Sequence, residues 1–258
     1  MFWMGPALGL LERACIRSVL RQGHPLTLWC YDPPAGVPEG VTIADASAVF
    51  PESAVIRHRG GSVALFANRF RYELMRRGAG IWLDSDVYLL KPIGSADTLL
   101  FREPLPAAAS GGGRLEPING SILRLPPDSP MLPPLLALFG EKIVPHWLPL
   151  GARMGARWRL LTTGKVGLGL MPWGVAGPKA LTAIAVEQGL YDLARPADVL
   201  HPFAWDEADW IADPERRLEE RATERTIGIH LWNEVVKPIK DRPAPPGSFL
   251  ARLQHEGA

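Results

Sequence analysis

The first third of the chain alternates short apolar segments with amphipathic helical patterns, and this alternation most constrains the fold. Short runs of apolar, β-branched and aromatic residues indicate strands, whereas apolar residues three or four positions apart indicate helices. The order is a strand at 2–4, a helix at 8–22, strands at 26–31 and 41–43, a helix at 62–77 and a strand at 81–83. Such alternation is typical of parallel strands joined by helices. The expected fold class is therefore α/β, with a single Rossmann-like, mostly parallel sheet flanked by helices.

The remainder of the chain is more irregular. Proline pairs interrupt it at 126–127 and 133–134, a helical pattern occupies 178–189, and a last strand pattern at 227–232 precedes a proline-rich end. No linker demands a second independent domain, and 258 residues suit one domain of mixed architecture. We therefore expect one domain over residues 1–258, whose C-terminal part is irregular.

The charges of the chain nearly cancel, with 28 Lys and Arg against 27 Asp and Glu. This balance argues against nucleic-acid binding through an overall basic field. Two cysteines, Cys15 and Cys30, cannot form a disulfide framework and favour reduced thiols over a single bridge. The apolar N-terminus is short and is interrupted by Glu12 and Arg13, and no apolar run reaches the about 18 residues of a membrane span. We expect a cytoplasmic protein.

Two aspartates, Asp84 and Asp86, directly follow the uninterrupted apolar segment at 81–83. Residues two apart in an extended chain point to the same side, so the two carboxylates can converge on one point. The ends of strands are where open α/β sheets bind ligands. Neighbouring carboxylates repel each other unless a cation neutralises them, and oxygen ligands suit Mg²⁺ or Mn²⁺. The alternative is a pair of turn aspartates that cap the next segment.

The residues around this pair form an ordered block. It consists of Phe66-Ala67-Asn68-Arg69-Phe70-Arg71-Tyr72 in the helical segment, then Gly78-Ala79-Gly80, the apolar segment, Asp84-Ser85-Asp86 and Val87-Tyr88-Leu89-Leu90-Lys91-Pro92. The block at 66–92 resembles the core of the glycosyltransferases with a DXD sugar-binding motif, which include α1,4-galactosyltransferases, initiating α1,6-mannosyltransferases and bacterial capsule or lipopolysaccharide enzymes. Ala67-Asn68 stands where that family has Ser-Asp, so Asn68 keeps a hydrogen-bonding role but lacks a charge. Gly78-Ala79-Gly80 replaces the family's Gly-Gly pair.

Further segments are similar to the same family, in the same order along the chain. They are the opening segment from Trp3, Ile118-Asn119-Gly120-Ser121-Ile122-Leu123, the segment from Trp173 to Thr182, and His230-Leu231-Trp232-Asn233-Glu234. The last of these matches closely, and the others are weaker. The resemblance implies a GT-A type fold, with a nucleotide-sugar-binding half at 1–95 and an acceptor-side half at 96–258.

The resemblance also implies a reaction and its site residues. A hexose would move from a UDP- or GDP-sugar to a saccharide or glycolipid acceptor with retained configuration, using Mn²⁺ or Mg²⁺. Carried over by position, the catalytic residues are Asp84, Asp86 and Arg71, and the metal ligands are Asp86, His230 and Asp84. The donor would contact Trp3, Asn68, Arg71, Asp84, Ser85 and Lys237, and the acceptor would contact Asn119, Trp173 and Gly177.

Several of these residues also have a plainer interpretation. His230 could be a satisfied core histidine, and Arg71 could belong to an ion pair at a helix end. Lys237 could be a solvated lysine of the tail, and Trp3 could be a core tryptophan.

A basic stretch at 142–165 contains Trp147 and Trp158. It could touch an anionic or lipid-linked acceptor at a membrane surface, which would be a peripheral membrane contact. The alternative is a solvated helix face with two core tryptophans, because charge runs are usually surface.

Two other functions compete with the transferase. A hydrolase that uses Asp84 and Asp86 as acid and base is disfavoured, because glycosidase carboxylates flank the scissile bond and two residues at one strand end do not. A nucleotide-sugar-binding or structural protein without catalytic activity remains the alternative. Metal-dependent binding together with product formation would separate the two.

Overall fold

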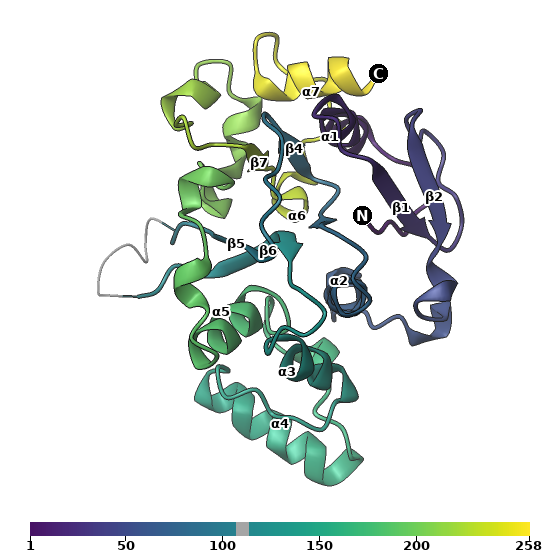
Figure 1. The fold of residues 1–258 in the computed structure, drawn as a ribbon, viewed down its shortest axis with the longest axis vertical. Coiled ribbons are helices and arrows are strands. Elements are labelled where there is room, and N and C mark those ends of the chain that lie inside the picture. The colour runs from purple at the N-terminus through teal and green to yellow at the C-terminus, as the bar shows by residue number, and fades with distance from the viewer. Residues whose placement is uncertain (107–113) are drawn as a thin grey trace.

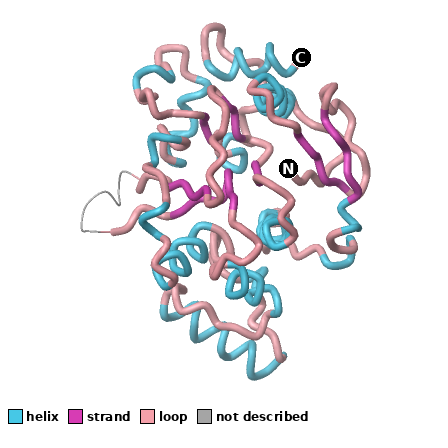
Figure 2. Tube along the Cα trace, in the orientation of Figure 1, coloured by secondary structure: helices cyan, strands magenta, loops and turns pink. Residues whose placement is uncertain are grey.

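The computed structural model describes residues 1–106 and 114–258 of the chain (Figure 1). The helices are α1 (Leu10–Arg21), α2 (Ala64–Arg76), α3 (Leu132–Ala137), α4 (Leu150–Thr163), α5 (Pro178–Glu187), α6 (Asn233–Val236) and α7 (Phe249–Gly257). The strands are β1 (Leu26–Cys30), β2 (Val41–Asp45), β3 (Trp82–Leu83), β4 (Val87–Leu89), β5 (Leu99–Arg102), β6 (Ile118–Arg124) and β7 (Gly228–His230). The protein is thus α/β. Strands β3–β7 lie near the middle, β1 and β2 lie along one side, and most helices lie toward the two ends (Figure 2).

The N-terminal part follows the predicted order of elements. Phe2 forms a parallel bridge with Trp29 of β1, and β1 pairs with β2 in parallel, from Leu26 opposite Val41 to Cys30 opposite Asp45. Helix α1 connects the segment of Phe2 to β1, so the predicted order is kept, although residues 2–4 form an isolated bridge at Phe2 and not the predicted strand.

The expectation of one mostly parallel sheet is wrong. The paired strands form three small sheets in the described part, and two of them are antiparallel: β3–β6–β5 and β4–β7. The physical reason lies in the connections. Parallel neighbours need a long crossover, usually a helix, whereas β3 and β4 are separated by three residues and no helix lies between β3 and β5. The repeating strand–helix order therefore stops after β3.

Helix α2 buries the side that the sequence predicted. Phe66, Phe70 and Leu74 lie four apart and are at most 5% exposed. Phe70 stacks on Phe2 with ring centroids 4.8 Å apart and lies next to Trp82 of β3. This packing fixes β3, and with it the residues that follow β3, against the N-terminal segment.

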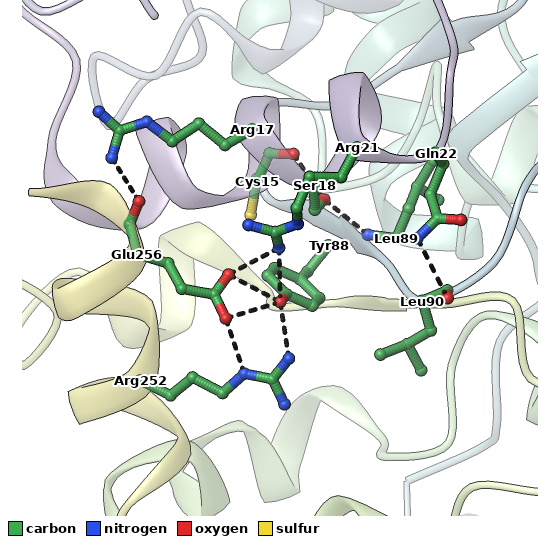
Figure 3. A network of polar contacts seen from close by, with 10 residues as sticks. All are labelled: Cys15, Arg17, Ser18, Arg21, Gln22, Tyr88, Leu89, Leu90, Arg252 and Glu256. Carbon is green, nitrogen blue, oxygen red and sulfur yellow. Dashed lines mark hydrogen bonds and ion pairs between the residues drawn. The ribbon is translucent and has the colours of Figure 1, made fainter.

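The C-terminal helix α7 packs along α1 and holds the strand that follows the aspartates (Figure 3). The buried hydroxyl of Tyr88, on β4, donates to the Glu256 carboxylate and accepts from Arg21 and Arg252 at 2.8 and 2.9 Å. Ser18 on α1 accepts a hydrogen bond from the backbone N–H of Leu89. Both ends of the described chain therefore help to position β4.

The remaining features bear on the predicted organisation. Between α5 and β7 the chain forms only loops and 3-10 turns, as expected for an irregular C-terminal part. Cys15 and Cys30 are both buried free thiols. Among the described residues, no helix combines the length and apolarity that crossing a membrane requires.

Candidate functional site

A cleft of about 830 Å³ lies where the N-terminal segment, α2 and the end of β3 meet the segments around Trp173 and β7. Its lining includes Trp3, Asn68, Arg71, Asp84, Ser85, Asp86, Asn119, Trp173, His230 and Lys237. Ten predicted site residues therefore surround one cavity. Gly177 does not line the cleft; it is the residue before α5, and a Cβ there would lie 3.2 Å from the Asn68 amide.

Backbone hydrogen bonds fix the segment that holds the two aspartates. The N–H of Asp84 donates to the carbonyl of Ser121, at the end of the β3–β6 pairing, with an N–O distance of 2.7 Å. The carbonyl of Asp86 accepts from the N–H of Leu231 at 2.9 Å, so the segment is also tied to the end of β7. The aspartates are held between two antiparallel sheets.

The β4–β7 pairing brings His230 beside Asp86. Val87 lies opposite His230 in the register, and the His230 Nε2 is 3.3 Å from the Asp86 Oδ2. The same oxygen accepts the backbone N–H of Asn233, the first residue of α6, at 2.7 Å. The antiparallel sheet thus joins two motifs that are far apart in the sequence.

Asp84 is held by different partners. Its Oδ1 accepts from the Arg71 Nη2 at 2.9 Å and from the indole N–H of Trp82 at 2.7 Å. Arg71 is 7% exposed, donates to the carbonyl of Gly120 and lies over the ring of Trp82. Arg71 therefore orients Asp84. The alternative interpretation of Arg71 from the sequence, as a member of an ion pair, agrees with this contact.

The electrostatics distinguish the two carboxylates. Burial raises the pKa of Asp84, and the guanidinium of Arg71 offsets this only in part, while the Asp86 charge adds to the rise. Burial would also raise the pKa of Asp86, but the charge and hydrogen bond of His230, with the Asn233 N–H, lower it to about 2. Burial lowers the pKa of His230, but Asp86 outweighs it and the net direction is upward. Asp86 and His230 thus favour each other's charged form, as the members of an ion pair do.

The donor set fits a divalent cation. Asp84, Asp86 and His230 each offer one ligand atom, and these atoms lie within 4.8 Å of one another. His230 is 8% exposed, yet its Nδ1 has no hydrogen-bond partner among the described residues. A buried ring nitrogen without a partner is costly unless something else satisfies it. Two carboxylates and an imidazole beside a cleft are ligands that divalent metals use.

Two buried or cleft-lining residues that pack against predicted site residues were not predicted from the sequence. Glu103 follows β5 and lines the cleft, and its carboxylate accepts from the Asn119 amide at 2.5 Å. His201 is 1% exposed, contacts the Ser121 hydroxyl at 3.2 Å and lies with its ring 5.4 Å from that of His230. Arg102 separates Glu103 from the apolar run at 99–101, and only two apolar residues precede His201, so neither residue shows the local signal that singles out Asp84.

A scan of protein-family models and a search of curated proteins gave no match to this chain.

Proposed function

We propose that the protein is a cytoplasmic, metal-dependent glycosyltransferase that moves a hexose from a UDP- or GDP-sugar to a saccharide or glycolipid acceptor with retained configuration. One observation carries this proposal: Asp84 and Asp86 of the DXD-like segment lie with His230 of the closing segment in one group at the cleft. The resemblance of residues 66–92 and 230–234 to DXD glycosyltransferases had assigned these three residues to one metal.

The proposed metal is Mn²⁺ or Mg²⁺, held by Asp84, Asp86 and His230. When bound, it would supply Lewis-acid stabilisation of the negative charge that develops on a leaving diphosphate. The imidazole in the donor set favours Mn²⁺ over Mg²⁺, because Mg²⁺ prefers oxygen ligands.

The other cleft residues take positioning roles in this proposal. Arg71 and Trp82 hold the Asp84 carboxylate in one orientation through two hydrogen bonds. Lys237 lines the same cleft and would attract the anionic diphosphate. Trp173 is half exposed at the cleft and offers a flat face to a sugar acceptor, while the Asn119 amide is oriented by Glu103. No dedicated nucleophile is assigned, so the acceptor would attack from the face that the diphosphate leaves.

The first experiment measures binding. Thermal unfolding of the purified chain is followed with Mn²⁺, with UDP or GDP, and with both together. We expect stabilisation that requires the metal, because a ligand that binds only the folded state raises its apparent stability. Asp86→Ala and His230→Ala should abolish it. Asp97→Ala removes a carboxylate with 88% side-chain exposure and serves as the matched control.

The second experiment measures turnover with a panel of nucleotide sugars and saccharide acceptors. Metal-dependent transfer that Asp86→Ala removes would support the transferase. Metal-dependent nucleotide binding without a product would favour the binding protein without activity. Full transfer activity in Asp86→Ala would overturn the assignment of the site.

A further inference from the structure

Helix α4 presents a stripe of large apolar side chains to solvent. Four residues of this helix, spaced four, four and three apart, are 61–83% exposed: Leu150, Met154, Trp158 and Leu161. Such spacing places them on one face of an α-helix. The opposite face packs on the hydrophobic core through Ala152, Ala156 and Leu160. Helix α4 therefore has two apolar faces, one packed on the core and one exposed. The expectation that Trp158 is a core residue is wrong.

The charged side chains of the segment that contains this stripe have one sign. Residues 142–186 contain no Asp or Glu, although the whole chain has 27. The same residues include six Lys and Arg: Lys142, Arg153, Arg157, Arg159, Lys165 and Lys179. None of the six forms an ion pair within the described ranges 1–106 and 114–258. Arg157 and Lys165 are exposed, so their charges are available to an anionic surface.

We propose that α4 binds the surface of an anionic phospholipid bilayer, lying in the plane of the interface with its apolar stripe inserted. An interfacial helix of this kind has an apolar face with Trp and Leu and basic residues beside it. Trp158 would lie at the headgroup level, where indole rings are favoured, and Arg157 would meet the lipid phosphates.

The charge pattern favours a bilayer over a second copy of the chain. A symmetric dimer through this face would bring the same basic segments of two copies together, and like charges oppose such an interface. The anionic headgroups of a bilayer are complementary to the same charges. Helix α4 also lies at one end of the molecule, where it can approach a flat surface (Figure 1).

Helix α4 is linked to the cleft through a second cavity. A smaller cavity lies between α4 and residues 170–172, and Pro172 lines both this cavity and the main cleft. Leu170 and Trp173, which are 57% and 50% exposed, lie along this path. If the proposed function holds, on which this step rests, membrane binding brings the cleft toward an acceptor carried by a lipid.

The test is flotation of the purified chain with vesicles, without metal or nucleotide. One vesicle preparation is phosphatidylcholine alone, and the other contains about 30 mol % phosphatidylglycerol, which supplies the negative surface potential. We expect binding to the anionic vesicles that weakens with salt. The variant Trp158→Ser with Leu161→Ser should bind at least about tenfold more weakly, because burial of one Leu-sized side chain changes a binding constant by about this factor.

Two further variants make the test specific. Arg157→Gln with Lys165→Gln should weaken binding to anionic vesicles while leaving the apolar stripe intact. Ile43→Ser removes an exposed apolar side chain from β2, away from α4, and should bind as the unmodified chain does. Circular dichroism confirms that each variant is folded, which is expected because all five side chains are exposed.

Three results would overturn the proposal. They are no flotation with anionic vesicles, equal flotation of the stripe variant, and a concentration-dependent dimer without lipid that the stripe variant abolishes. The last would show that the stripe is an interface between copies. Since flotation uses no nucleotide sugar, its failure would leave the proposed transferase function intact, and loss of transfer activity would leave the membrane result intact.

Discussion

The pair formed by Arg71 and Asp84 offers the sharpest test of how the site is held. Arg71→Met keeps much of the aliphatic side chain but removes the guanidinium, which is 2.9 Å from Asp84 and bonds the carbonyl of Gly120. Removing one member of a buried ion pair costs about 3–5 kcal/mol. The Asp84 side chain is 25% exposed, so water screens part of this cost. We expect a loss of about 3 kcal/mol in the free energy of unfolding.

The assay is urea unfolding at pH 7 with a chelator, so that no metal contributes. Arg76→Met is the matched control on the same helix, because Arg76 is 55% exposed in its bridge to Glu73. The buried Glu73 carboxylate keeps a second guanidinium, that of Arg77 at 2.7 Å, so losing the exposed Arg76 should cost at most about 1 kcal/mol. Arg71→Met combined with Asp84→Asn should cost at least about 1 kcal/mol less than the sum of the single variants. Equal losses for Arg71→Met and Arg76→Met, or strict additivity, would refute the reasoning.

Three further predictions concern the ion pair beside the cleft and the C-terminal helix. In metal-free protein, the Asp86–His230 pair should stabilise the fold between about pH 4 and 6.5. This contribution is lost as the pH falls toward 2, where Asp86 is protonated, and as it rises through the raised pKa of His230. The difference in the free energy of unfolding between the unmodified chain and His230→Gln, measured by urea unfolding, should therefore become smaller at both ends of this pH range. Tyr88→Phe should cost about 1–3 kcal/mol in urea unfolding, because Glu256 and two arginines lose a buried hydroxyl. Gly257→Ala would place a methyl group against the carbonyl of the first residue of α1, and we expect a lower midpoint of thermal unfolding.

Local patterns predicted the elements that hold the site. The four-residue spacing of Phe66, Phe70 and Leu74 identified α2 and its buried side, and the apolar run at 81–83 identified a buried strand. Glycines that end the helical pattern marked its boundary, because their freedom at positive φ suits the turn at Gly78 and Gly80. These patterns depend only on neighbouring residues, and the corresponding elements are present in the fold.

Strand pairing could not be predicted in the same way. Whether β3 pairs with a parallel or an antiparallel neighbour depends on β6, and β4 pairs with β7 at the far end of the chain. Glu103 and His201 also depend on these long-range pairings, since neither belongs to a recognisable local pattern. Single-sequence periodicity specifies which face of an element is apolar, but it does not specify the partner of that face.

The arrangement of charges implies that cation binding is coupled to a proton. Without a cation, Asp84 is compensated by Arg71, and Asp86 is compensated by His230. Asp86 raises the pKa of His230, so without a cation the imidazole keeps its proton to a higher pH than a free histidine does. A histidine must be neutral to bind a metal. A cation at this group would therefore replace the proton of His230 as the partner of Asp86, and Mn²⁺ affinity measured by calorimetry should rise with pH until His230 is fully neutral. The same affinity in His230→Gln should lose this pH dependence, whereas an unchanged slope would place the cation away from His230.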